Sequence, residues 1–164
     1  MLKRILLTVL TTIVLSFMLA PDSQALDLDK ALVIGTGPKK VIEFTDPDCP
    51  FCRKASAYFK NRSDITRYVF FTPLKIHPNA RQKIQYILSA NSKDRVRLYH
   101  EVMSGQVDRM VLDKLPITAA GIKLQEEQQA ETERAKVDST PTFMIMGRIV
   151  EGFDLRKIEE LLGN

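Results

Sequence analysis

The sequence predicts an α/β domain in which helices cover both faces of one sheet and a helical block is inserted midway. Three observations support this prediction. Short runs rich in β-branched and aromatic residues occur in both halves of the chain, which is typical of strands. Apolar residues at helical spacing fill the middle of the chain. The resulting order is strand, strand, helix, strand, helical block, strand, strand, helix, and the 164 residues suit one domain.

The first 25 residues have the three parts of a secretory signal peptide. Lys3 and Arg4 are positive, residues 5–20 are apolar, and Ser23-Gln24-Ala25 is a small-x-small cleavage pattern. A retained membrane anchor is the alternative, but an apolar run of 16 residues is shorter than the ~20 that span a bilayer. We therefore expect 1–25 to be a signal peptide, 26–164 to be the folded domain, and the protein to be exported.

The first half of the domain is expected to contain three strands and one helix. Asp46-Pro47-Asp48 ends the second strand, because proline cannot donate to a sheet ladder. Cys49 stands at the expected N-cap of the helix, and Pro50 occupies the first helical position, which proline favours. The expected strands cover residues 28–34, 41–45 and 66–72, and the expected helix covers residues 50–60.

The second half of the domain is expected to be helical before the chain returns to the sheet. The polar middle of residues 117–137 predicts an exposed helix face, and Gly121 can break that helix. Asp154 can cap the final helix. The expected helices cover 79–90, 92–103, 107–115, 117–137 and the stretch after Asp154, and the expected strands cover 142–146 and 149–151.

The charge pattern argues against a nucleic-acid partner. The net charge is +4, and it falls to about +3 when the signal peptide is removed with two basic residues and one acidic residue. Basic residues are interleaved with acidic ones along the chain, which predicts a solvated mixed surface. We therefore expect no nucleic-acid partner.

The only two cysteines, Cys49 and Cys52, are separated by two residues. That spacing suits a redox-active dithiol or half of a metal site. A structural disulfide here would close a loop of only four residues, and short loops stabilise least. A closed zinc site needs four ligands, and neither His77 nor His100 pairs with another ligand at tight spacing. We therefore predict a dithiol, with no metal and no cofactor.

The position of the cysteines at a helix start assigns their roles. A thiolate attacks a disulfide, and the free N–H groups and the dipole at a helix N-terminus favour negative charge. Cys49 is therefore expected to be the exposed nucleophile. Cys52, one turn further along, is expected to be the more buried resolving thiol that breaks the mixed disulfide. Pro50 and Phe51 place no side-chain charge between them.

Glu43 is the second residue expected to take part in the chemistry. It lies in the strand 41–45, on the same face as Val41 and Thr45. A central strand of an α/β sheet is covered on both faces, and burial raises the pKa of a carboxyl group. Glu43 would then accept the proton of Cys52 as that thiol attacks, which is a general-base role. The alternative is an edge strand with Glu43 in solvent.

Thr140-Pro141 precedes the predicted strand 142–146. X-Pro bonds are the ones that can be cis. A cis bond would leave the backbone of Thr140 facing outward, able to pair with an extended peptide.

These segments resemble the thioredoxin-fold disulfide oxidoreductases of the bacterial cell envelope, most closely the catalytic domain of the DsbC/DsbG isomerase group. The resemblance is carried by Phe44-Thr45-Asp46-Pro47-Asp48-Cys49-Pro50-Phe51-Cys52-Arg53-Lys54 and by Ser139-Thr140-Pro141-Thr142-Phe143 followed by Gly147. Glu43, six residues before Cys49, is similar to the buried acid of thioredoxin-like and DsbA-like enzymes. The resemblance implies a thioredoxin-like fold with a helical insertion between the central strand and the cis-proline loop, and a location in the periplasm or cell envelope.

Two departures from the DsbC/DsbG pattern accompany this resemblance. The stretch between Leu26 and Val41 is too short for that group's N-terminal dimerisation domain, so no separate dimerisation domain is expected. Ser139 stands where a glycine is common in the proline loop. The resemblance covers most of residues 29–164, and residues 75–130 match only as a helical insertion.

The resemblance implies an exported thiol–disulfide oxidoreductase that forms, reduces or isomerises disulfides in cysteine-containing protein substrates, together with a membrane or soluble redox partner. The residues expected to carry the chemistry are Cys49, Cys52 and Glu43, and those expected to contact substrate are Thr140, Pro141, Pro50 and Phe51. Two other functions stay open at this point. One is a redox-inert peptide-binding or chaperone module that uses the same groove, and the other is a specialised reductant in cytochrome c maturation.

Overall fold

The computed structural model describes residues 25–163. The predicted signal peptide, apart from Ala25, lies outside the described residues. Within the described part of the chain, no helix is both long enough and apolar enough to cross a membrane.

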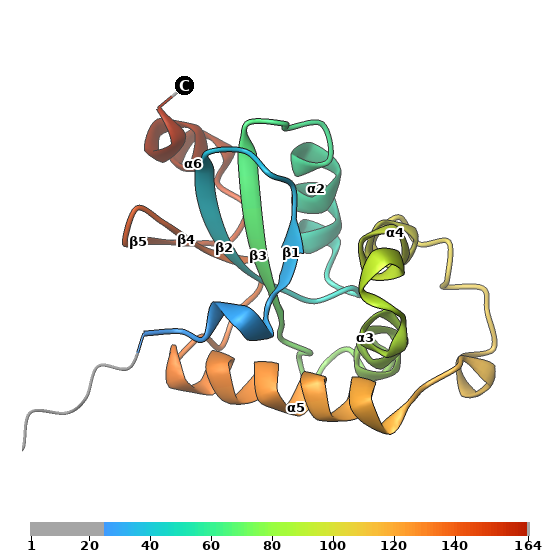
Figure 1. The fold of residues 1–164 in the computed structure, drawn as a ribbon. Helices are drawn as coiled ribbons and strands as arrows, with labels where there is room; N and C mark the ends of the chain where they lie inside the picture. The colour runs from blue at the N-terminus through green and yellow to red at the C-terminus, as the bar shows by residue number, and fades with distance from the viewer. Residues whose placement is uncertain (1–24, 164) are drawn as a thin grey trace, which may run out of the picture.

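A five-stranded sheet with β2 at its centre organises the fold (Figure 1). β2 and β3 are parallel, and the other neighbouring strands are antiparallel. The strands, in order across the sheet, are β1 (Leu32–Ile34), β3 (Ile65–Phe71), β2 (Lys39–Thr45), β4 (Thr142–Ile145) and β5 (Arg148–Glu151). This order rules out the alternative in which Glu43 belongs to an edge strand.

Helices cover both faces of this sheet. α2 (Pro50–Phe59) and α6 (Leu155–Leu162) pack on one face, where their apolar residues join Val41 and Phe143 in one core cluster. The helices between β3 and β4, which we call the helical insertion, are α3 (Ala80–Ser89), α4 (Ser92–Met103) and α5 (Ala119–Arg134). The C-terminal end of α5 lies beside Ile42 and Met144, on the opposite face. The predicted α/β order with a helical insertion is confirmed.

The first predicted strand, residues 28–34, is only half correct. A 3-10 turn, η1 (Leu28–Lys30), precedes β1. The Asp27 side chain accepts a hydrogen bond from the backbone N–H of Asp29, at 3.1 Å, and so caps this turn. The strand therefore begins only at Leu32.

The predicted helix over residues 107–115 is wrong. The chain there contains only a 3-10 turn, η2 (Leu112–Lys114). Gly105, at φ 82°, turns the chain sharply after α4, and the following residues form hydrogen-bonded turns. Asp108 in this segment binds cations from α2 and α3, so the segment follows those contacts instead of an α-helical path.

The predicted exposed face of residues 117–137 is only partly correct, because Lys123 and Glu126 are exposed but other residues of the polar middle are buried. α5 does not break at Gly121. Gln125 and Gln128 are fully buried. The side-chain oxygens of both accept hydrogen bonds, whereas Gln125 Nε2 has no hydrogen-bond partner among the described residues. Gln85 donates to Gln125 Oε1 at 2.9 Å, and Gln128 Oε1 accepts from the backbone N–H of Phe71 at 3.0 Å. At Gly121, a Cβ atom would lie 2.2 Å from Ser89 Oγ, so glycine permits α5 to pack closely on the end of α3.

Candidate active site at the two cysteines

The two cysteines lie at the start of α2, directly after the carboxyl end of the central strand. Cys49 is the N-cap residue and Pro50 opens the helix, as the sequence predicts. The backbone N–H of Cys49 donates to Asp46 O at 3.1 Å, which closes the turn between β2 and α2. Both cysteines are free thiols. The fold therefore presents Cys49 at a helix N-terminus, where negative charge is favoured.

Cys49 is less exposed than the sequence analysis expected. Its exposed fraction is 5 %, and Cys52 is completely buried. The Cys49 thiol donates to the carbonyl oxygen of Thr140 at 3.5 Å, so the loop before β4 covers the sulfur. The surface beside Cys49 is formed by Pro50, which is exposed, and by Phe51, which is 56 % exposed.

The environment of Cys52 favours its protonated form. Burial raises the pKa of the Cys52 thiol well above its ordinary value. The backbone N–H of Asp46, 3.4 Å from Cys52 Sγ, and the nearby hydroxyls of Thr140 and Thr45 offset only part of this effect. These two hydroxyls are themselves buried without a hydrogen bond of standard geometry among the described residues. Cys52 must therefore lose a proton before it can attack a disulfide.

The loop before β4 brings its backbone to Cys49. The Thr140–Pro141 peptide bond is cis, as the resemblance implies. The backbone N–H of Gly152 donates to Pro141 O at 2.7 Å, which ties the loop to the end of β5. Thr140 O lies on the Cys49 side. Thr140 and Pro141 are thus brought together with the cysteines.

Glu43 is completely buried on β2, as predicted, but it has a cationic partner that the sequence analysis missed. Glu43 Oε2 accepts a hydrogen bond from Arg67 Nη1 at 2.8 Å. Arg67, on β3, is 2 % exposed and also donates to the hydroxyl of Tyr99 at 3.1 Å. Glu43 Oε1 has no hydrogen-bond partner in the described part of the chain. The role of Glu43 as the acceptor of the Cys52 proton stays a prediction, because none of the contacts of the Cys52 sulfur involves Glu43.

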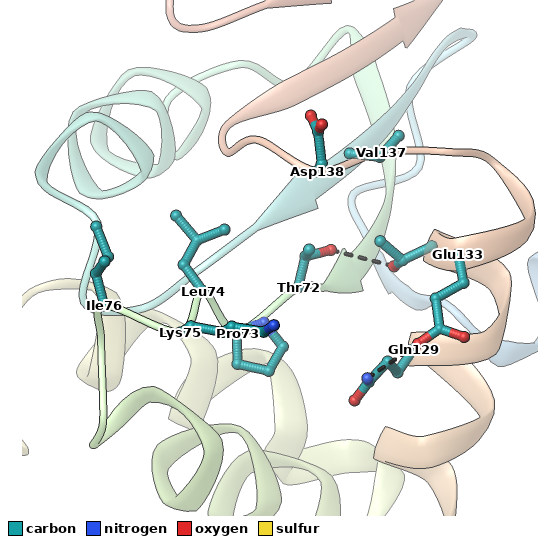
Figure 2. Close-up of a pocket in the computed structure, with 10 residues that line it drawn as sticks. Thr72, Pro73, Leu74, Lys75, Ile76, Gln129, Glu133, Val137 and Asp138 are labelled. Carbon is teal, nitrogen blue, oxygen red and sulfur yellow. Dashed lines mark hydrogen bonds between the residues drawn. The ribbon is translucent and has the colours of Figure 1, made fainter.

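An open groove of about 420 Å³ lies between the segment after β3 and the C-terminal part of α5 with the residues that follow it (Figure 2). Leu74 and Ile76 line one side of it, and Val137 and Asp138 line the other. At the base of the groove, the hydroxyls of Thr72 and of Thr132 on α5 are hydrogen-bonded at 3.1 Å. Neither cysteine lines this groove. On one side the backbone N–H of Leu74 donates to Asp46 at 2.7 Å, and on the other side the chain continues from Asp138 to Thr140.

The metal-site alternative requires further ligands grouped with the cysteines. Among residues 25–163, no three His, Cys, Asp or Glu side chains are grouped so as to hold a metal ion. His77 binds Asp46, and burial lowers the pKa of His100 on α4.

The sequence profile of the thioredoxin-like domain family matches residues 26–153. The chain belongs to this family. A probable thiol:disulfide interchange protein DsbC from Bordetella avium is 29 % identical over 118 residues. That match covers 71 % of this chain and 39 % of the relative, so the chain spans well under half of that protein's length.

Solved structures share the same thioredoxin-like architecture. A disulfide interchange protein from Neisseria gonorrhoeae matches with a TM-score of 0.68 and 28 % identity, covering 84 % of this chain and 97 % of the other. The catalytic domain of Proteus mirabilis ScsC matches with a TM-score of 0.64 and 17 % identity, covering 82 % and 88 % of the two chains. At that identity the second match shows the fold alone.

The thioredoxin-like domain contains one site residue that the sequence analysis undervalued. The sequence analysis places Asp46 only in the turn that ends the second strand, and His77 only as a residue without a nearby second metal ligand. Asp46 is completely buried, and its carboxylate accepts from the backbone N–H groups of Asp48 and Leu74, each at 2.7 Å, and contacts His77 Nδ1 at 3.0 Å. The Asp-Pro-Asp turn was the available signal, because an aspartate side chain often binds the backbone two residues on.

Proposed function

We propose that this protein is an exported thiol–disulfide oxidoreductase that acts on cysteine-containing proteins through the Cys49-Pro50-Phe51-Cys52 dithiol. The observation that carries the proposal is the placement of the two thiols. Cys49 caps the N-terminus of α2 and contacts the Thr140 carbonyl, while Cys52 lies buried one turn further into the helix. The names of the Bordetella and Neisseria relatives support it.

The dithiol supports a two-step exchange. The Cys49 thiolate attacks one sulfur of a substrate disulfide, a Cys49–substrate disulfide forms, and the other substrate sulfur leaves as a thiolate. Cys52 then loses its proton and attacks Cys49 Sγ. The second substrate thiolate leaves, and a Cys49–Cys52 disulfide remains. Two electrons pass from the protein to the substrate, and the reverse sequence oxidises a substrate dithiol. A membrane or soluble redox partner would restore the starting state and so set the direction.

The other predicted residues support these steps in distinct ways. The positive end of α2 favours the Cys49 thiolate that starts the reaction. Glu43 would accept the proton that Cys52 holds in its buried environment. The backbone of Thr140, before Pro141, would align an extended substrate segment beside Cys49. Pro50 and Phe51 offer an exposed apolar contact for that segment.

Reduction of insulin by the purified mature protein in the presence of dithiothreitol tests this proposal. Wild type is expected to accelerate the reaction, and Cys49→Ala to abolish the acceleration. Cys52→Ala is the matched control, because it keeps the nucleophile and is expected to accumulate a mixed disulfide with substrate. Acceleration that survives Cys49→Ala would overturn the enzymatic reading. An inactive wild type that still suppresses aggregation would favour the peptide-binding alternative.

A further inference from the structure

Four charged side chains form a closed cluster next to the cysteines, and we call them the rim cluster. They come from separate segments: the loop before α2, α2 itself, α3, and the loop after α4. The members are Asp48, Arg53, Lys83 and Asp108. Two cations and two anions make the cluster neutral.

Lys83 is the centre of the rim cluster. Its side chain is only 5 % exposed, and its ammonium nitrogen lies 2.5 Å from Asp48 Oδ1 and 2.5 Å from Asp108 Oδ1. A buried ammonium group with two carboxylate partners is compensated, whereas a single unpaired one would be costly. Lys83 therefore joins the helical insertion to the loop that carries the nucleophile.

Arg53 completes the rim cluster from the helix of the cysteines. Its guanidinium donates to both oxygens of Asp108, at 2.6 and 2.8 Å, and to Asp48 Oδ1 at 3.3 Å. Its Nε donates to Pro47 O at 2.6 Å. The bidentate contact lowers the pKa of Asp108 to about 2, so Asp108 is ionised at neutral pH. A Cβ at Gly105 would lie 3.1 Å from Asp108 Oδ2, so a small residue there leaves room for the cluster.

The rim cluster matters because Asp48 directly precedes Cys49. An unpaired carboxylate beside a thiol disfavours the thiolate. Asp48 Oδ1 instead receives hydrogen bonds from Lys83 and Arg53, so its charge is balanced next to the nucleophile. Two other titratable groups near the cysteines, Asp46 and His77, contact each other at 3.0 Å, and the Lys54 ammonium lies over the Phe51 ring, 5.3 Å from its centroid.

We propose that Lys83 and Asp108 of the helical insertion are positioning residues that hold Asp48 and thereby set the charge felt by Cys49. They touch neither sulfur and act through Asp48 and Arg53. The proposal deepens the proposed function and rests on it, because it concerns how readily Cys49 becomes a thiolate.

The electrostatic role predicts opposite effects for the two residues. Lys83→Met removes a cation and leaves net negative charge beside Cys49, so the Cys49 pKa is expected to rise. Asp108→Asn removes an anion, so the Cys49 pKa is expected to fall. Each shift is expected to be on the order of half a pKa unit, which is about threefold in the acid constant of the thiol. The double variant restores neutrality and should lie close to wild type.

The experiment measures the Cys49 pKa from the pH dependence of thiolate absorbance and of alkylation rate, on the reduced protein without substrate. Lys123→Met is the matched control, because that lysine is 77 % exposed on α5. It should leave the pKa unchanged. The equilibrium with glutathione disulfide gives a second readout: Lys83→Met should favour the Cys49–Cys52 disulfide and Asp108→Asn should oppose it.

A purely structural role would move both variants in the same direction, along with their thermal stability, and that result overturns the proposal. So would two variants whose Cys49 pKa equals that of wild type. Failure of the proposed function looks different. In that case wild type would not form the Cys49–Cys52 disulfide with glutathione or reduce insulin, while the thiol pKa values would still report on the rim cluster.

Discussion

Two charged groupings of the domain differ in depth. The Glu43–Arg67 pair, which we call the deep pair, has side chains that are 0 % and 2 % exposed. In the rim cluster, the exposed fraction of the side chain rises from 5 % at Lys83 to 35 % at Asp108. Buried charges carry a large desolvation cost and depend on one another, whereas exposed pairs are screened by water and salt. The deep pair should therefore affect mainly the free energy of unfolding and the transfer of the Cys52 proton. The rim cluster should affect mainly how readily the Cys49 thiol ionises.

Arg67→Met is expected to give the largest effect, because it leaves the Glu43 carboxyl buried without its cation. Breaking a buried pair from one side typically costs ~3–5 kcal/mol of unfolding free energy. Urea unfolding followed by circular dichroism measures this loss. Removing both charges in Glu43→Gln/Arg67→Met should cost less than the single change. A loss below about 1 kcal/mol would mean that the pair contributes little more than a surface pair does.

Glu43→Gln tests whether the Glu43 carboxylate of the deep pair accepts the proton of Cys52. Resolution of a Cys49 mixed disulfide by Cys52 should slow near neutral pH by on the order of 100-fold, the lower range for loss of a general base. Rapid acid quenching at a temperature where both proteins are folded gives the rate. The first attack, measured as alkylation of Cys49, should change much less. Equal slowing of both steps contradicts a proton-acceptor role.

Asp108→Asn is expected to have the smallest effect on stability. The folded-state pKa of Asp108 is lowered from 3.8 to about 2, chiefly by Arg53. The stabilisation from its charge is therefore present above about pH 4, and it is lost as the pH falls through about 2. Because the side chain is partly exposed, we expect a contribution below about 1 kcal/mol. Unfolding of wild type and variant should differ at pH 6 and converge near pH 2, and high salt should shrink the difference at pH 6.

Local patterns in the sequence predicted the parts of the site that depend on neighbouring residues. Pro50 after Cys49 marked the start of α2, and the alternation around Glu43 marked its burial. The partners of these residues could not be predicted in the same way. Arg67 lies inside an apolar strand, and only the pairing of β3 with β2 brings it to Glu43. Lys83 lies 35 residues from Asp48, and their contact depends on how α3 packs.

The errors outside the site have the same physical origin. A stretch rich in glutamine is typical of a solvated helix face, yet Gln128 is buried because Phe71 and Lys30 present backbone groups to it. Residues 107–115 have helix-forming composition, but Asp108 is held by Arg53 and Lys83. In both places a long-range polar contact outweighs the local propensity.

Gln128 also constrains the order in which the domain can be completed. Its amide accepts from the backbone of Phe71, 57 residues earlier, and donates to the carbonyl of Lys30, 98 residues earlier, at 2.6 Å. During synthesis both backbone groups leave the ribosome well before α5 does, and they must stay hydrated or otherwise bonded until it arrives. The end of η1 and the end of β3 are therefore completed by a residue that is made late. Contacts of such long sequence separation are characteristic of slow-folding topologies.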